Sequence, residues 1–142
     1  MKGTYILLIE LPQPQEITVG KLGLLAFSQG FYAYVGSAMK GLETRIGRHL
    51  RREKKLHWHI DYLLEEALIR EIVRCETEER AECTLAQILA GEFLSIPGFG
   101  SSDCQCSSHL YFDTEQDKLA KEIIEAADSL GVKSRVSHYE KV

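Results

Sequence analysis

The chain has 142 residues, of which 44% are hydrophobic and 27% charged, a composition typical of one globular domain that buries its own core. No apolar run approaches the roughly 20 residues of a membrane-spanning helix, and the residues after Met1 lack the pattern of a signal peptide. We therefore expect a cytoplasmic protein with no membrane partner. The net charge of −4 argues against a protein that coats nucleic acid without specificity.

The beginning of the chain predicts several short strands. Residues 4–11 form a nearly continuous apolar run, typical of a buried strand, and two prolines follow it. Residues 17–19, 24–27 and 31–36 are three further strand candidates, separated by turns that contain glycine. We expect these strands to form an antiparallel meander.

Residues 41–52 predict a helix. Its apolar side chains recur every four residues and would face the core: Leu42, Ile46 and Leu50. Arg45 and His49 lie at the border of this apolar stripe, from which a side chain can reach into a cleft. Arg48 and Arg52 lie far from the stripe and would face solvent.

The rest of the chain alternates helices and strands. In order, we expect a helix at 57–67, a strand at 69–74, a helix at 78–90, a loop at 95–108, a strand at 109–112, a helix capped by Thr114 that ends at Leu130, and a strand at 134–139. The prediction is a single domain over residues 1–142, of mixed α/β (α+β) class, with a small, mainly antiparallel sheet flanked by helices.

Positive charge is concentrated in residues 40–55, which hold seven Lys or Arg against two Glu, so the rest of the chain carries −9. Directly before this segment, Tyr32 and Tyr34 lie on one face of the predicted strand, because side chains alternate with a period of two. A strand that brings a phenol to the start of a cationic helix suits a site for phosphate. We expect Tyr32 to serve packing only.

A known superfamily has this arrangement. Gly3-Thr4-Tyr5, Tyr34-Val35-Gly36 and the helix that carries Arg45 and His49 resemble the GIY-YIG nucleases, over residues 3 to about 90. The whole chain is similar to a branch of that superfamily that shares three blocks: Tyr34 to Ala38 (YVGSA), His57 to Asp61 (HWHID) and Gly98 to Cys104 (GFGSSDC).

The resemblance implies a metal-dependent phosphodiesterase site. Tyr5 and Tyr34 match the paired tyrosines, one of which helps to activate or position the attacking water. Arg45 matches the arginine that stabilises charge on the scissile phosphate, and His49 matches a position that takes part in proton transfer. Glu82 matches the single carboxylate that holds the metal ion. The further substrate contacts that we expect are Arg48, Arg51, Arg52, His57 and His59.

The block at 57–61 permits two interpretations. Asp61 lies four residues after His57 and could orient its imidazole on a helix face. Alternatively, Asp61 or His59 satisfies backbone donors at the start of a helix. We favour the functional interpretation.

One carboxylate cannot cage Mg²⁺, but Mg²⁺ keeps several waters and is completed by substrate phosphates, so we expect Mg²⁺ or Mn²⁺ that binds together with substrate. Cys104, Cys106 and His109, with Cys83 as a fourth ligand, could hold Zn²⁺. Their spacing is not a standard zinc pattern, so we do not expect zinc. Ser101, Ser102 and Asp103 are alternative residues of the cleft lining.

The chain departs from the superfamily pattern in two places. Tyr5 and Tyr34 are 29 residues apart, so an extended insert separates the first two motif strands and could occupy the sheet edge or partly cover the cleft. Arg45 follows Tyr34 by 11 residues, one more than the pattern has, which predicts a small insertion at residues 39–40.

The resulting hypothesis is a nucleic-acid phosphodiesterase, of the endonuclease type that processes DNA rather than RNA. A non-catalytic nucleic-acid-binding module that retains the cleft is the alternative, because phosphate binding needs only cations. An enzyme that acts on another phosphorylated ligand is a third possibility. The oligomeric state does not follow from the sequence.

Overall fold

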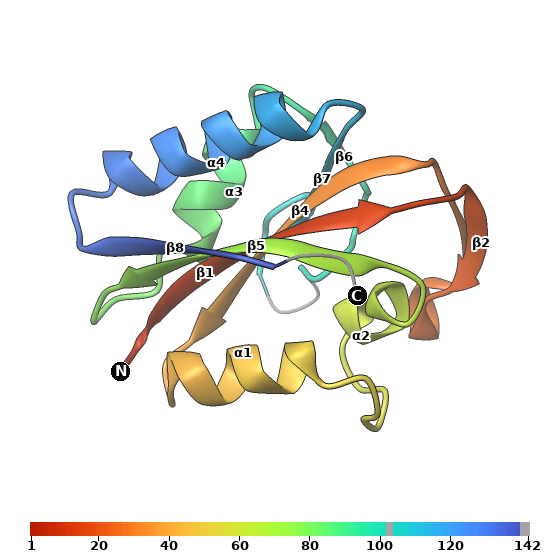
Figure 1. Ribbon diagram of the computed structural model, residues 1–142, viewed down its shortest axis with the longest axis horizontal. Helices are drawn as coiled ribbons and strands as arrows, with labels where there is room; N and C mark the ends of the chain where they lie inside the picture. The colour runs from red at the N-terminus through yellow and green to blue at the C-terminus, as the bar shows by residue number, and fades with distance from the viewer. Residues whose placement is uncertain (102–103, 140–142) are drawn as a thin grey trace.

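The computed structural model describes residues 1–101 and 104–139, and it has three layers: helices, a sheet and helices (Figure 1). In chain order the elements are β1 (Gly3–Leu11), β2 (Gln15–Thr18), η1 (Gly20–Leu22), β3 (Leu24–Phe27), β4 (Gly30–Ala38), α1 (Leu42–Leu50), α2 (His59–Leu64), β5 (Leu68–Glu76), α3 (Glu82–Ala90), β6 (Leu94–Ser95), β7 (Leu110–Asp113), α4 (Gln116–Ser129) and β8 (Ser134–His138). Six strands form the main sheet in the order β6-β7-β4-β1-β5-β8, and each neighbouring pair is antiparallel. The predicted fold class is confirmed.

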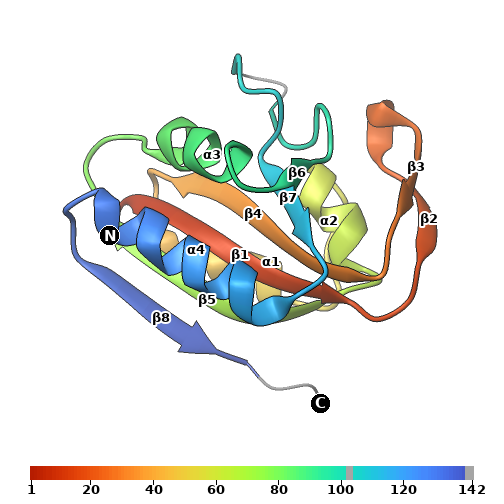
Figure 2. The same cartoon turned by 90° about the horizontal axis from the view of Figure 1, so that it is seen from above.

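Strand β1 lies at the centre and is buried on both faces, which explains its nearly continuous apolar sequence. Its odd-numbered residues, such as Tyr5 and Leu7, belong to the core beneath α1 and α2. Its even-numbered residues, such as Ile6 and Leu8, belong to the core beneath α3 and α4. Figure 2 shows α3 and α4 lying together over one face of the sheet.

The pairing of β1 with β4 puts Tyr5 opposite Gly36. A Cβ atom at residue 36 would overlap the Cζ and Oη atoms of Tyr5, so the phenol lies directly over the glycine backbone. The Tyr5 ring therefore occupies the space that a side chain at residue 36 would need. This contact gives a physical reason for the glycine of the Tyr34-Val35-Gly36 motif.

The insert between β1 and β4 forms a separate ribbon. Strands occur where they were predicted, but β2 and β3 pair only with each other, and β1 pairs directly with β4. The predicted meander is therefore wrong, because β4 and β5 occupy the two edges of β1 and leave no place for β2 in the sheet. The ribbon packs against α2 instead of covering the edge of the main sheet.

Several predicted boundaries and faces need correction. Helix α3 begins at Glu82 rather than at residue 78, because Thr77 accepts a hydrogen bond from the Glu79 N–H in a local turn. The side chain of Thr114 does not cap α4, which begins at Gln116. In α1, Leu50 is 39% exposed and His49 is buried in its place. No helix in the described part of the chain is both long and apolar enough to cross a membrane.

The contact between Gly36 and Tyr5 predicts the effect of one substitution. We expect Gly36→Ala to lower the free energy of unfolding by about 2 kcal/mol, because the new methyl group displaces the buried Tyr5 ring. Gly47→Ala is the matched control, since a Cβ in that exposed part of α1 meets open space and should stabilise the helix by about 1 kcal/mol. Urea unfolding measures both, and a neutral Gly36→Ala would contradict the packing of Tyr5.

Candidate active site

A cleft of about 340 Å³ lies at the open edge of β4. Strand β7 pairs with β4 only from Phe31 to Tyr34. Just beyond this pairing, the Val35 N–H donates a 3.0 Å hydrogen bond to the carbonyl of His109, which precedes β7. The end of β4 is thus free to form a wall. The cleft is lined by Tyr34, Val35, Gly36, Ser37, Arg45, His57, Trp58, His59, Arg80, Glu82, Gly100 and His109.

Arg45 is held at the cleft by two contacts. Its Nη1 donates to the Ser37 carbonyl at 3.1 Å, and its guanidinium carbon lies 4.3 Å from the centroid of the Trp58 ring. The same ring also stacks against Arg48, at 4.2 Å. Stacking on an aromatic face orients the planar guanidinium while leaving part of its hydrogen-bonding edge for a ligand.

Tyr5 and His49 lie behind Tyr34 rather than in the cleft lining. The Tyr5 Oη and His49 Nε2 atoms are 2.6 Å apart, and the ring of Tyr34 lies 6.5 Å from that of Tyr5 and 6.2 Å from that of His49. Tyr5 and His49 are 1% and 3% exposed. Of the four predicted catalytic residues, Tyr34 and Arg45 line the cleft, and Tyr5 and His49 form a buried, hydrogen-bonded pair behind them.

Burial controls the protonation of this group. It raises the pKa of Tyr5, which the neighbouring Arg45 guanidinium opposes, and it raises the pKa of Tyr34 well above its usual value. Burial lowers the pKa of His49 to about 3. All three side chains are therefore neutral at physiological pH. The Nδ1 atom of His49 is buried and has no hydrogen-bond partner among the described residues.

Glu82 lies in the first turn of α3 and contributes to the same cleft lining as Arg45. Its side chain is 16% exposed and its carboxylate is 3.8 Å from Arg80 Nη1. The neighbouring acids Glu78 and Glu79 are exposed and are not part of the lining. The structure thus brings Tyr34, Arg45 and Glu82 together from a strand and two helices.

The pairing of Asp61 with the imidazole of His57 is wrong, because Asp61 satisfies backbone donors at the start of α2 instead. Asp61 is completely buried and accepts hydrogen bonds from the backbone N–H groups of His57 and Trp58, both at 2.9 Å. Arg48 forms a bidentate ion pair with Asp61, in which Nη1 and Nη2 donate to the two carboxylate oxygens at 2.8 and 2.9 Å. Burial would raise the pKa of Asp61, but Arg48 and the two N–H donors hold it below its usual value.

The five predicted substrate contacts differ in where the structure places them. His57 and His59 line the cleft, and His59 Nδ1 accepts a 2.8 Å hydrogen bond from the Gly100 N–H. Arg51 and Arg52 are exposed and lie outside the cleft lining. The prediction that Arg48 faces solvent is wrong, because its side chain is only 19% exposed and its donors are engaged by Asp61.

Trp58 and Arg80 are charged or aromatic cleft residues that were not among the predicted site residues. Trp58 supports Arg45, and its place between two histidines in the block at 57–61 was the available signal. Arg80 lines the cleft beside Glu82, and no pattern in the sequence indicated it. Ser101 is described and buried, whereas Ser102 and Asp103, two predicted lining residues, lie outside the described residues.

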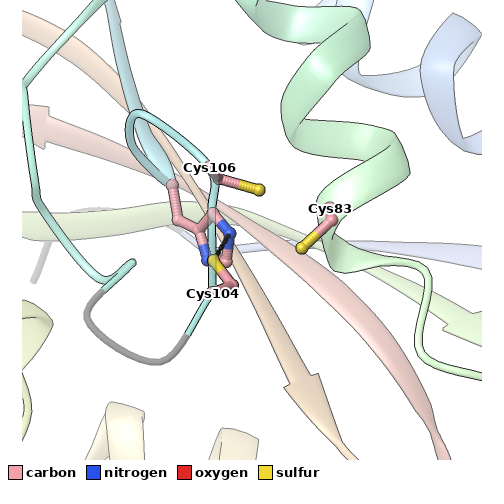
Figure 3. A group of neighbouring side chains, drawn as sticks. Cys83, Cys104 and Cys106 are labelled. Carbon is pink, nitrogen blue, oxygen red and sulfur yellow. Dashed lines mark hydrogen bonds between the residues drawn. The ribbon is translucent and has the colours of Figure 1, made fainter.

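A second group of side chains corrects the cofactor prediction. The ligand atoms of Cys83, Cys104, Cys106 and His109 all lie within 4.8 Å of one another (Figure 3). Three thiols and an imidazole form a ligand set typical of Zn²⁺, not of Mg²⁺ or Mn²⁺, which prefer oxygen. Among the described residues this is the one group of three or more potential ligands, and Glu82 does not belong to it. The expectation of Mg²⁺ or Mn²⁺ without zinc is therefore wrong.

The spacing was misleading because the ligands come from two distant segments. Cys83 projects from α3, whereas Cys104, Cys106 and His109 precede β7. A standard zinc motif has two closely spaced pairs of ligands, whereas here three ligands lie before β7 and the fourth, Cys83, is brought to them by the folding of the chain.

Comparison with known proteins identifies a family but no chemistry. The model of the family described as "Domain of unknown function DUF123" matches residues 4–132. Neither the curated proteins nor the solved structures include a significant match.

The buried Asp61 predicts a large loss of stability when its charge is removed. We expect Asp61→Asn to lower the free energy of unfolding by about 3 kcal/mol, because Arg48 loses its partner in a buried site. Glu78→Gln removes an ion pair with Lys2 that is 87% exposed on the glutamate side, and should change stability by less than about 0.5 kcal/mol. Equal effects of the two substitutions in chemical unfolding would contradict a structural role for Asp61.

The low pKa of His49 predicts how stability changes with pH. Between about 3 and 6.5 the unfolded chain binds a proton at His49 and the folded chain does not, so stability increases with pH in this window. On acidification below 6.5, His49 should destabilise the fold by about 1.4 kcal/mol per pH unit.

Urea unfolding at several pH values measures this slope. His49→Gln should remove it, whereas His138→Gln, at a position with a 73% exposed side chain, should retain it. A native slope in His49→Gln would show that His49 is not held neutral by burial.

Proposed function

The chain belongs to the DUF123 family, and from the geometry of its cleft we propose that it is a nucleic-acid phosphodiesterase of the GIY-YIG kind, with DNA as the preferred substrate. The observation that carries this proposal is the convergence of Tyr34, Arg45 and Glu82 on one cleft beside the free end of β4. These residues offer a phenol, a cation and a carboxylate, which can position a water molecule, stabilise charge on a phosphate and transfer a proton.

Arg45 is the residue that would stabilise the charge that develops on the scissile phosphate. Its contacts with Ser37 and Trp58 hold the guanidinium in place before a substrate binds. A preorganised cation of this kind acts more strongly on the transition state than a mobile surface lysine, because it does not need to reorganise during the reaction.

Tyr34 is the phenol with access to the cleft, so it would contact the attacking water or the phosphate. Tyr5 and His49 would act from behind it. The neutral His49 imidazole, 2.6 Å from the Tyr5 Oη atom, can share a hydrogen bond with the phenol and hold its ring in place. In this scheme His49 is a positioning residue for Tyr5, and it does not touch the substrate.

Glu82 is the carboxylate of the cleft and would take part in proton transfer. A carboxylate beside the phosphate can position the attacking water and accept its proton. Arg80, 3.8 Å from the carboxylate, offsets part of its negative charge next to the phosphate.

A nucleic acid also fits the distribution of charge around the cleft. Arg51 and Arg52 are exposed on the segment that follows α1, beyond the cleft itself. A polymer with repeated phosphates can contact them while one phosphate occupies the cleft, and a small phosphorylated ligand cannot.

The four cysteines are all free thiols, which suits a reducing, cytoplasmic location.

One observation favours the alternative of a binding module without activity. Tyr5 and His49 lie outside the cleft lining, so Arg45 and the surrounding cations could hold a phosphate without any proton transfer. Binding and cleavage must therefore be measured separately.

Cleavage of single-stranded, duplex and branched DNA, and of RNA, with a series of divalent cations tests the proposal. We expect the native chain to cut DNA, and Arg45→Ala and Glu82→Gln each to lower the rate by about 100-fold or more, because each removes a group that acts on the transition state. Arg135→Ala and Glu125→Gln alter exposed residues away from the cleft and should retain the native rate.

The outcomes distinguish the hypotheses. DNA binding by the native chain without cleavage would reject the enzyme in favour of the binding module. Cleavage that is unaffected by Glu82→Gln would show that Glu82 takes no part in the reaction.

A further inference from the structure

We propose that Cys83, Cys104, Cys106 and His109 bind one Zn²⁺ ion that ties the segment before β7 to the start of α3 and thereby fixes the width of the cleft. This inference does not depend on the proposed nuclease activity. It concerns a site whose ligands are separate from Tyr34, Arg45 and Glu82.

The geometry is close to that of a loaded site. Sulfur atoms bound to a tetrahedral zinc at about 2.3 Å lie about 3.8 Å apart, and the four ligand atoms here lie within 4.8 Å of one another. Cys104 Sγ and His109 Nε2 are already 3.5 Å apart. In Figure 3 the side chain of Cys83 projects from α3 toward those of Cys104 and Cys106. A contraction of about 1 Å would complete the tetrahedron.

The ligand types identify the ion and its role. Soft thiolates together with an imidazole favour Zn²⁺ over the hard cations that bind oxygen. Four protein ligands fill a tetrahedral site and leave no position for water or substrate, which is the arrangement of a structural zinc rather than a catalytic one. The free energy of metal binding then contributes directly to the stability of the segments that carry the ligands.

The cluster joins two walls of the cleft. On one side, Cys83 directly follows Glu82 at the start of α3. On the other side, His109 lines the cleft and its carbonyl accepts the hydrogen bond from Val35, while Gly100 donates to His59. An ion bound between these two segments would hold Glu82 at a constant distance from the opposite wall.

Metal analysis of the native chain, purified without chelators from medium that contains zinc, tests the site directly. We expect one zinc per chain. Cys83→Ser and Cys106→Ser should each lose the metal, whereas His109→Cys should retain it by providing a fourth thiolate. Cys75→Ala removes a buried thiol outside the cluster and should retain the metal as the control. Replacement by Co²⁺ should produce the absorption bands of a tetrahedral thiolate site.

The native chain decides the outcome even if a variant does not fold. Absence of metal, iron in place of zinc, or a disulfide within the cluster would each overturn the proposal. Because no nucleic acid is used, these results are independent of any failure to detect cleavage.

Amide hydrogen exchange tests the structural role of the ion. Removal of zinc by a chelator should accelerate exchange at Gly100 and His109 by about tenfold or more, because their hydrogen bonds belong to the tethered segment. Exchange at Ile6 and Leu8 in the central strand should not change. Loss of zinc with no change at Gly100 and His109 would overturn the role in fixing the cleft.

Discussion

The packing of Tyr5 over Gly36 is the constraint on which the site depends. It joins the central strand β1 to β4 in one register, because a shift by one residue would bring a side chain under the phenol ring. The same register buries Tyr5 against His49 and leaves Tyr34 at the cleft. The sheet therefore determines which tyrosine can meet a ligand and which one supports it.

Two further ties place the helices around this edge. Asp61 binds Arg48 of α1 and the backbone before α2. These contacts place the Trp58 ring against the guanidinium of Arg45. The thiol cluster performs the corresponding function on the other side, where it joins α3 to the segment before β7. A buried ion pair and a cysteine cluster thus hold the two walls, and neither of them includes Tyr34, Arg45 or Glu82.

Much of the fold followed from local patterns. The apolar run of β1, the tyrosines of β4 and the position of α1 were all predicted from periodicity and turn residues. The error at His49 and Leu50 is instructive. Seven residues after Leu42 a helical position lies within about 20° of the same face, whereas eight residues after it the position is about 80° away. The helical period should have placed His49, and not Leu50, in the core.

By itself, the sequence determined the class of the fold, the burial of β1 and most of the residues from which a phosphate site could be built. Only the tertiary structure decided how these residues are used. Arg45 and Arg48 have the same chemistry and lie one turn apart, yet one faces the cleft and the other is bound to Asp61. Cys83 joins Cys104, Cys106 and His109 only after the chain has folded. Local periodicity fixes the direction of a side chain on its own element, but its partner belongs to a distant element whose position is set by packing.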